Sequence, residues 1–274
     1  MTFADAVKKL DQAGVEAARY DAAILAERLC GINRATLPLM YGEELNSPEF
    51  DAAIESRANR TPLQYILGGW EFFGIWFELD ENCLCPRPDT EITVENALKL
   101  LPENGRFLEL CTGSGCISVS ICKTRHDLSG IATDKFQGTA AIARKNAEAQ
   151  EVSDRLTVVV ADLFESPDYI GDSLFDAVIS NPPYIPSKDI EGLSEEVKKE
   201  PIAALDGGED GLDFYRHIIN EYAKYLKTDG AMIFEIGYDQ GEALRSISEC
   251  CGYVCEIFKD LEGNDRVAII NVKE

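Results

Sequence analysis

The first 60 residues carry hydrophobic side chains at helical spacing. Apolar residues recur every three or four positions over 3–10, and Thr2 with Asp5 forms a capping-box pattern in front of them. The same spacing predicts a second helix over 21–29 and a third helix that begins at Ser47-Pro48. Because short amphipathic helices cannot bury their apolar faces alone, we expect them to pack into a small all-α bundle.

Residues 69–85 have a different pattern, in which apolar and polar side chains alternate around a central Gly74. Alternation of this kind predicts a β-hairpin. The run Pro86-Arg87-Pro88 follows directly and interrupts regular structure. We therefore divide the chain into a helical domain over 1–68, a hairpin linker over 69–85 and a larger domain over 86–274.

From Arg106 onward, short apolar runs alternate with helical stretches. The apolar runs cover 107–111, 130–133, 157–161, 175–180, 231–236, 253–258 and 266–271. About seven strands separated by helices predict an α/β fold with a layered sheet. The last two runs are joined by residues 259–265, which are too few for a helical crossover, so that pair should be antiparallel.

The composition of the chain limits the kinds of partner that it can bind. The 274 residues include 26 Lys and Arg against 49 Asp and Glu, which gives a net charge of −23. Tight binding to nucleic acid or to an anionic membrane needs clustered cationic side chains, so both are disfavoured. No apolar run approaches the ~18 residues of a membrane span, and the N-terminus lacks the features of a signal peptide. We therefore expect a cytoplasmic protein.

The nine cysteines do not indicate a metal site. They form no CxxC pair, and neither His126 nor His217 lies near a cysteine pair at ligand spacing. In a reducing compartment, these thiols are best interpreted as small buried hydrophobic residues. We expect no bound metal, and we assign no chemistry to the two histidines.

The segment Leu108–Ser118 has the pattern of an apolar strand, a turn with Gly113 and Gly115, and the start of a helix. Glycines in such a turn let the backbone approach a ligand closely, and the N-terminus of the helix favours negative charge. A dinucleotide fingerprint would have a third glycine where Ser118 stands, and a P-loop would have a lysine after the glycines. Neither class of nucleotide site is favoured.

Carboxylates end the next two strands. Asp134 could accept both ribose hydroxyls of a nucleoside, and Asp162 could accept the amino group of adenine. Glu109 adds a negative charge that suits an ammonium group. An adenosine cofactor with an amino acid and a cationic sulfur fits this lining better than a polyphosphate does. Alternatively, each aspartate only caps a turn after its strand, which is the more common role of a single Asp.

The fourth strand ends at the same edge of the sheet in Asn181-Pro182-Pro183-Tyr184. An amide or aromatic amine nitrogen is a weak nucleophile because its lone pair is delocalised. The side-chain carbonyl of Asn181 and the main-chain carbonyl of Pro182 could accept its two N–H groups, orient it and stabilise its developing positive charge. Tyr184 would supply a flat surface for it. In isolation, Asn-Pro-Pro would indicate only the end of a strand.

With these motifs, the chain resembles the bacterial release factor glutamine methyltransferases (the PrmC/HemK family) over essentially its whole length. The matching stretches are Pro62–Gly68, Pro86–Glu91, Thr112–Gly115, Asn181–Pro186, Glu200-Pro201, Asp206–Tyr215 and Glu235–Gly237. The Asn-Pro-Pro-Tyr motif alone is shared with DNA and RNA amino-methyltransferases. Together with the Pro-Arg-Pro segment and the N-terminal helical region, it is much more specific.

The resemblance implies a class I S-adenosylmethionine-dependent methyltransferase domain, which is Rossmann-like, after a helical domain that contacts the substrate protein. It implies transfer of a methyl group from S-adenosyl-L-methionine, leaving S-adenosyl-L-homocysteine. The acceptor is the side-chain amide nitrogen (N5) of the glutamine in the Gly-Gly-Gln motif of peptide-chain release factors. We take these factors as the partner and expect the chain to act as a monomer.

Together, the residue patterns and the family's motifs assign the site residues. The expected cofactor-binding residues are Glu109, Cys111, Thr112, Gly113, Ser114, Gly115, Asp134, Asp162, Leu163 and Asn181. The expected substrate-binding residues are Asn181, Pro182, Pro183 and Tyr184, with Asn181, Pro182 and Tyr184 as catalytic residues. The family usually has glycine where Cys111 stands, and we expect the small cysteine to be tolerated. Arg87 either pairs with an acidic neighbour or orients the segment that covers the cofactor.

Two other functions fit part of the pattern. An N6-adenine or N2-guanine methyltransferase acting on DNA or RNA would use the same four-residue motif, but it should bring a basic groove or a target-recognition insert. The net charge and the compact length argue against both. A non-enzymatic adenosine-binding module would not need Asn-Pro-Pro-Tyr beside its ligand.

Overall fold

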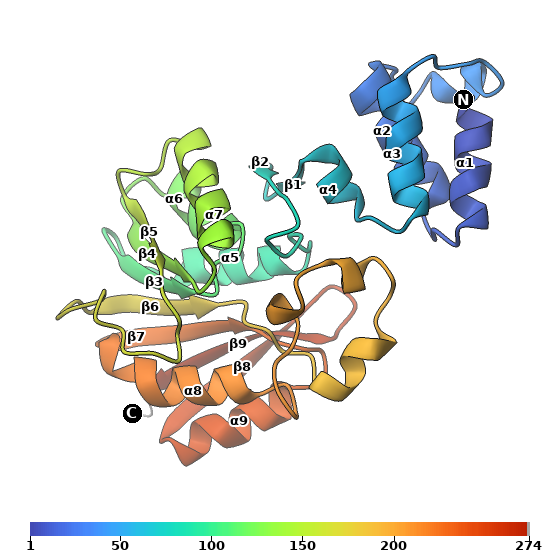
Figure 1. The fold of residues 1–274 in the computed structure, drawn as a ribbon. Coiled ribbons are helices and arrows are strands. Elements are labelled where there is room, and N and C mark those ends of the chain that lie inside the picture. Colours follow the sequence, from blue (N-terminus) through green and yellow to red (C-terminus); the bar gives the residue numbers. More distant parts are fainter. Residues whose placement is uncertain (273–274) are drawn as a thin grey trace.

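In the computed structural model, which describes residues 1–272, the chain begins with a helical bundle (Figure 1). Its helices are α1 (Phe3–Gln12), α2 (Ala18–Cys30) and α3 (Pro48–Ala58), with a short 3-10 turn η1 (Leu37–Met40) between α2 and α3. The capping box at Thr2 and Asp5 is present, and Gly31 ends α2 in the left-handed conformation. The predicted all-α bundle is confirmed.

The bundle has a hydrophobic core of its own. Large side chains from all of its helices meet there, among them Phe3, Leu10, Leu25, Phe50 and Ile54, each at most 1% exposed. Burying one such side chain stabilises the fold by about 1.5–3 kcal/mol. The apolar spacing that predicted the helices is therefore the same feature that holds them together.

The short helix α4 (Leu63–Leu67) leads into a hairpin of β1 (Gly69–Phe72) and β2 (Ile75–Glu78). The strands are antiparallel, and the last pair, Phe72 with Ile75, leaves Phe73 and Gly74 as the two turn residues. Both turn residues have positive φ angles, +52° and +71°, as a type I′ turn requires. The predicted hairpin is confirmed.

The larger domain is built on a seven-stranded sheet with the order β5-β4-β3-β6-β7-β9-β8. Its strands are β3 (Arg106–Leu110), β4 (Ser129–Asp134), β5 (Leu156–Val160), β6 (Phe175–Ser180), β7 (Leu226–Glu235), β8 (Tyr253–Lys259) and β9 (Asp265–Val272). Neighbouring strands from β5 to β7 are parallel, whereas β9 is antiparallel to both β7 and β8. The predicted seven strands and antiparallel last pair are confirmed. The sequence did not reveal that β9 lies between β7 and β8.

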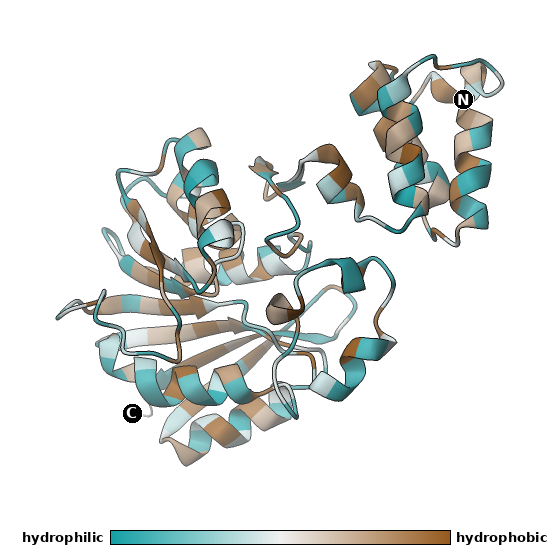
Figure 2. Cartoon of the chain, in the orientation of Figure 1, coloured by the Kyte–Doolittle hydropathy of each residue, from teal (hydrophilic) through white to brown (hydrophobic). Residues whose placement is uncertain are grey.

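Helices cover both faces of this sheet (Figure 1). One face carries α5 (Thr90–Leu100), α6 (Cys116–Thr124) and α7 (Gln137–Ala149); the other carries α8 (Asp213–Tyr222), followed by the 3-10 turn η5 (Ala223–Tyr225), and α9 (Gly241–Cys250). Figure 2 shows hydrophobic strands between helices with hydrophilic outward faces. The result is the layered α/β arrangement that the sequence predicts.

A buried side chain on α7, Asn146, helps to fix the hairpin to the larger domain. Its amide group donates hydrogen bonds to the main-chain carbonyls of Glu78 at 3.1 Å and Ser114 at 2.9 Å. Its side-chain carbonyl accepts the N–H of Glu78 at 2.8 Å. A buried amide without partners would be costly, and here both of its ends are satisfied. The hairpin is therefore tied to the loop after β3.

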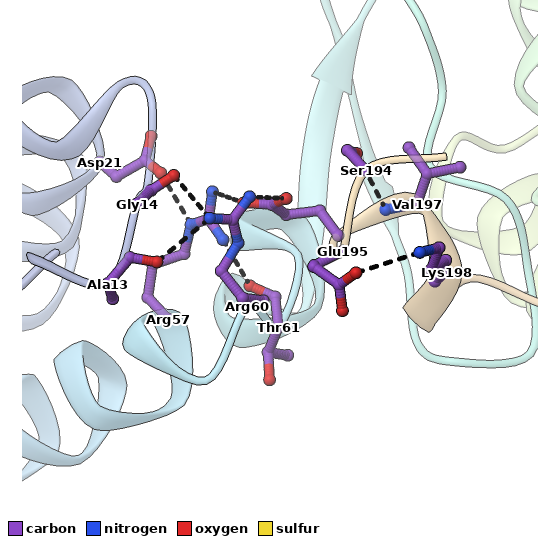
Figure 3. A network of polar contacts seen from close by, with 11 residues as sticks. Ala13, Gly14, Asp21, Arg57, Arg60, Thr61, Ser194, Glu195, Val197 and Lys198 are labelled. Atoms are coloured by element: carbon purple, nitrogen blue, oxygen red, sulfur yellow. Dashed lines mark hydrogen bonds and ion pairs between the residues drawn. The ribbon is translucent and has the colours of Figure 1, made fainter. Parts of the chain in front are cut away.

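Two arginines of the helical bundle contact one glutamate of the larger domain (Figure 3). Arg57 is buried, and it pairs with Asp21 at 2.7 Å and with Glu196 at 3.0 Å. Arg60 pairs with Glu196 at 2.5 Å and donates to the carbonyl of Gly14. Glu196 lies between β6 and α8, in what we call the bridging segment (residues 187–204), which contains η2 (Ser187–Gly192), η3 (Val197–Lys199) and η4 (Ile202–Ala204).

The cysteines only partly follow the prediction that they are buried. All nine are free. The buried ones are Cys83, Cys85, Cys116, Cys122 and Cys255, while Cys30 and Cys111 are partly exposed. Cys250 and Cys251 at the end of α9 are exposed, so the interpretation is wrong for these two. Over residues 1–272, the helices are too short or too polar to cross a membrane.

Candidate functional site

A cavity of about 540 Å³ opens at the carboxyl edge of the parallel strands. Ligands of α/β proteins bind at this edge. The predicted site residues that line it are Glu109, Cys111, Thr112, Gly113, Ser114, Asp134, Asp162, Leu163, Asn181 and Pro183. Other parts of its wall come from Cys83 of the linker, from Arg87 just after it, and from Pro201–Ala204 of the bridging segment. Four strand ends and two distant segments therefore share one cavity.

The loop between β3 and α6 has a left-handed backbone at Cys111, Gly113 and Gly115, with φ angles of +57°, +58° and +80°. A Cβ atom at Gly115 would lie 3.3 Å from the Cβ of Ala143, so this position has little space as well. Cys111 holds the same backbone conformation with a side chain attached, which costs an L-residue roughly 1–2 kcal/mol. This is a physical reason for the glycine that the family resemblance associates with this position.

Glu109 lies in β3 beneath the loop and is 1% exposed. Its Oε2 atom accepts hydrogen bonds from the hydroxyl of Thr112 at 2.6 Å and from the N–H of Ser118 at 3.2 Å. Burial raises the pKa of Glu109 to about 7, although these hydrogen bonds oppose the rise. A cationic group in the cavity would favour the ionised carboxylate, as the sequence analysis expects for an ammonium group.

Both aspartates that were predicted to bind the cofactor already accept hydrogen bonds from the protein. Asp134 accepts the N–H groups of Gly113 and Phe136, each at 3.0 Å, and burial raises its pKa. Asp162 accepts the N–H of Phe164 at 3.0 Å and pairs with Lys135. Burial alone would raise the pKa of Asp162, but Lys135 and this N–H lower it. Capping does not exclude ligand binding, because each carboxylate oxygen has two lone pairs.

Asn181 reaches the cavity from the carboxyl end of β6. Its Nδ2 atom donates a hydrogen bond to the hydroxyl of Thr90, 3.4 Å away at the start of α5. The side-chain carbonyl is thus the end of Asn181 that remains for a ligand. Three predicted site residues, Gly115, Pro182 and Tyr184, do not line the cavity.

The Tyr184 ring packs against the hydrophobic cluster of α8 and α9. Its main-chain carbonyl accepts a hydrogen bond from Gln240 at 2.9 Å. Pro182, two residues before it, is buried. Their contact with a substrate stays a prediction.

Arg87 and the bridging segment are joined through Glu200. The buried carboxylate of Glu200 forms an ion pair with Arg87, and its Oε2 atom accepts the N–H of Cys85 at 2.9 Å. The acidic partner that one interpretation of Arg87 anticipated is therefore observed. Arg87 also lines the cavity, beside the part of the bridging segment that follows Glu200.

Several residues of the cavity wall were missed by the sequence analysis. Phe136, Phe164 and Phe214 present aromatic rings there, and the rings of Phe164 and Phe214 pack edge to face with centroids 5.1 Å apart. Phe136 and Phe164 each follow a strand-ending aspartate by two residues, and that spacing was visible in the sequence. Ile202, which is 59% exposed, comes from the bridging segment, and no local pattern points to its place in the wall.

Two family models match the chain. The model described as the PrmC N-terminal domain matches residues 2–68, and the model described as the methyltransferase small domain matches residues 90–199. The first match covers the helical bundle and α4. The second covers the glycine loop, both strand-ending aspartates and the Asn-Pro-Pro-Tyr motif.

Whole-length relatives agree with these matches. The release factor glutamine methyltransferase of Geobacter sulfurreducens is 40% identical over 264 residues, 94% of this chain and 91% of that protein. That of Aquifex aeolicus is 38% identical over 258 residues, covering 92% and 90%. Among solved structures, the hMettl16 catalytic domain in complex with MAT2A 3′UTR hairpin 6 has a TM-score of 0.61, with 18% identity over 81% of this chain and 82% of that one. This likeness shows the methyltransferase fold alone.

Proposed function

The chain belongs to the release factor glutamine methyltransferase family, and from this membership we propose its reaction in detail. It transfers a methyl group from S-adenosyl-L-methionine to N5 of the glutamine in the Gly-Gly-Gln motif of peptide-chain release factors. One observation carries the proposal: Asn181 lines the same cavity as the glycine loop and Asp134. An acceptor for an amide and a lining suited to adenosine therefore lie within one volume.

The cavity fits this cofactor in size and in chemistry. A volume of about 540 Å³ is within the usual range of small-molecule sites. Asp134 would hold the ribose hydroxyls, Asp162 the adenine amino group and Glu109 the ammonium group, with the aromatic wall around the base. When bound, the cofactor supplies an electrophilic methyl group on a cationic sulfur. The loop over 111–115 and Leu163 complete the cofactor-binding set.

The residues of the chain position the acceptor nitrogen. The Oδ1 atom of Asn181 and the main-chain carbonyl of Pro182 each accept one N–H of the glutamine amide, while Pro183 and Tyr184 shape the space around it. Two acceptors fix the orientation of the nitrogen and stabilise the positive charge that develops on it. Such positioning can contribute ~7–11 kcal/mol to lowering the barrier. No general base with a shifted pKa is needed, because the methylated nitrogen becomes acidic.

The remaining parts of the proposal concern the partner. The helical domain over 1–68 contacts the release factor, the hairpin over 69–85 connects it to the methyltransferase domain over 86–274, and the chain acts as a monomer in the cytoplasm. A nucleic acid substrate is disfavoured because the net charge of −23 opposes binding to a polyanion. The names of the relatives favour the protein substrate as well.

Incubation with S-adenosyl-L-methionine and either a release factor or a nucleic acid tests the reaction. Mass analysis of peptides should find one added methyl on the glutamine of Gly-Gly-Gln. A release factor with alanine in place of that glutamine is the matched control and should stay unmodified. Transfer to nucleic acid alone would overturn the proposed function.

A further inference from the structure

A buried carboxyl group lies directly behind Asn181. Glu235 is the last residue of β7, and the parallel pairing of Ser180 with Phe234 places Asn181 and Glu235 as the next neighbours along their strands. Glu235 is 1% exposed. The side chains of Thr90 and Asn181 lie beside its carboxyl group, whereas Oε2 has no hydrogen-bond partner among the described residues. The mechanism above does not use this group.

The nearest cation does not neutralise Glu235 by direct pairing. Arg266 on β9 contributes to the electrostatic surroundings of the carboxyl group, but its Nη2 atom contacts Asp89 and Asp260, each at 3.2 Å. Its Nε atom is also buried without a partner over the described chain. Asp89 and Tyr184 face the same region. Neutral side chains that can donate hydrogen bonds therefore lie beside Glu235, and one of them is Asn181.

We propose that Glu235 is a positioning residue that sets the orientation of the Asn181 amide. This inference rests on the proposed function, in which Oδ1 of Asn181 accepts the substrate. In its ionised form, which prevails above about pH 7, Glu235 only accepts hydrogen bonds, and it then favours the orientation in which Asn181 turns its NH₂ group toward it. The contact between Nδ2 and Thr90 has the same direction. The carbonyl of Asn181 then faces the cavity, where an amide substrate needs an acceptor.

A carboxyl group at this position does not stabilise the folded protein. Burial raises the pKa of Glu235 to about 7, although Thr90, Arg266 and Asn181 oppose the rise, so the ionised form is costly in the folded protein. A neutral residue of the same shape would remove that cost. A glutamine would not impose one orientation on Asn181, however, because its amide both donates and accepts hydrogen bonds.

The test compares Glu235→Gln with a pair of substitutions at Thr90. For Glu235→Gln, kcat should fall roughly 10- to 100-fold, as expected for a misplaced catalytic contact. The affinity for S-adenosyl-L-methionine should change little, and the Tm should not fall, because the glutamine removes the cost of a buried charge. Thr90→Val should also lower kcat, and Thr90→Ser, which keeps the hydroxyl, should restore it. Glu109→Gln is the matched control, since it replaces another buried carboxyl group. In this variant, the affinity for the cofactor should change before kcat does.

Two readouts do not depend on turnover. A Gly-Gly-Gln peptide should bind the cofactor-free Glu235→Gln chain more weakly than wild type. The side-chain NH₂ signals of Asn181 should move in the NMR spectrum and exchange faster with solvent. The proposal is overturned if kcat, peptide affinity and these signals all match wild type, or if Tm and cofactor affinity fall in parallel with kcat. Should wild type fail to methylate a release factor, the proposed function fails, while the NMR signals still decide the role of Glu235.

Discussion

The ammonium group of Lys135 lies 2.8 Å from the carboxylate of Asp162, across the carboxyl ends of β4 and β5. The Lys135 side chain is mostly exposed, whereas that of Asp162 is largely covered. The carboxylate that the sequence analysis assigns to adenine is thus held by an ion pair and by the N–H of Phe164. An acceptor that is held in place loses little further freedom when a ligand binds.

Substitutions of Asp162 and Lys135 should show whether the carboxylate itself contacts the cofactor or whether the ion pair makes the main contribution to cofactor binding. Asp162→Ala should weaken the affinity for S-adenosyl-L-methionine about tenfold, the effect of losing one hydrogen bond to a charged group. Lys135→Met should weaken it less than about threefold, because exposed ion pairs contribute little. Titration calorimetry measures both. An equal loss of cofactor affinity in the two variants would mean that the affinity depends on the ion pair and not on the carboxylate alone.

Substitutions of Asn181 and Asp134 should have different effects on methyl transfer and on cofactor binding. Asn181→Ala should abolish methyl transfer and leave the cofactor affinity nearly intact, since its carbonyl serves the acceptor amide. Asp134→Ala should weaken cofactor binding first, because it removes both the ribose contact and the acceptor of the N–H of Gly113. Single-turnover rates and cofactor affinities, measured on the same preparations, distinguish the two. If cofactor binding disappeared in Asn181→Ala, this residue would belong chiefly to the cofactor site.

Glu109 should make the protein less stable as the pH rises. Its pKa is raised from 4.5 to about 7, so the folded chain binds a proton more tightly than the unfolded chain. Its contribution to stability is complete below about pH 4.5 and is lost as the pH rises through 7. The free energy of unfolding of Glu109→Gln, measured relative to wild type, should therefore be higher at pH 8 than at pH 4.5 by on the order of 3 kcal/mol. Urea unfolding across this range measures the gain, and the exposed Glu256→Gln should show none.

The left-handed backbone at Cys111 can be tested by comparing two small residues. Cys111→Ala and Cys111→Gly both remove the sulfur, but only glycine adopts a φ of +57° without a steric cost. Cys111→Gly should be more stable than Cys111→Ala by about 1 kcal/mol. Thermal unfolding of both proteins gives the difference. A more stable alanine variant would contradict a strained loop at this position.

Arg57 should be a major contributor to the stability of the helical bundle. Asp21 is only 4% exposed, and burial raises its pKa even though Arg57 opposes the rise. Arg57→Met would leave this carboxylate buried without its partner, at a cost of about 3–5 kcal/mol. Arg34→Met removes the exposed pair with Glu27 and should cost under about 1 kcal/mol. Denaturant unfolding compares the two, and similar losses would refute the distinction.

The sequence was sufficient where the local pattern and the fold agree. Hydrophobic spacing located the bundle, the hairpin and the strands, since each of these elements buries the side chains that form the pattern. The position of β9 between β7 and β8 could not be predicted in this way, because both orders leave the same residues buried. The glycine loop, Asp134 and Asn181 were found because each follows a strand, and parallel strands end at one edge.

Parts of the site that depend on distant contacts were harder to predict. Thr90 and Glu235 surround Asn181 only after α5 and β7 have packed beside β6, and each looks ordinary in its own stretch of sequence. The signals available for Glu235 were a charged residue within the apolar run 231–236 and the match of Glu235–Gly237 to the family. The packing of the Tyr184 ring against a hydrophobic cluster also depends on distant contacts, and the contact of Tyr184 with a substrate stays a prediction.

The bridging segment has two anchors four residues apart. Glu196 is held by Arg57 and Arg60 of the helical bundle, and Glu200 is held by Arg87 and the N–H of Cys85. The residues directly after the second anchor form part of the cavity wall. Through these two anchors, the bridging segment connects the helical bundle to the wall of the cavity, so a movement of the bundle that keeps its ion pairs would be transmitted toward Pro201–Ala204.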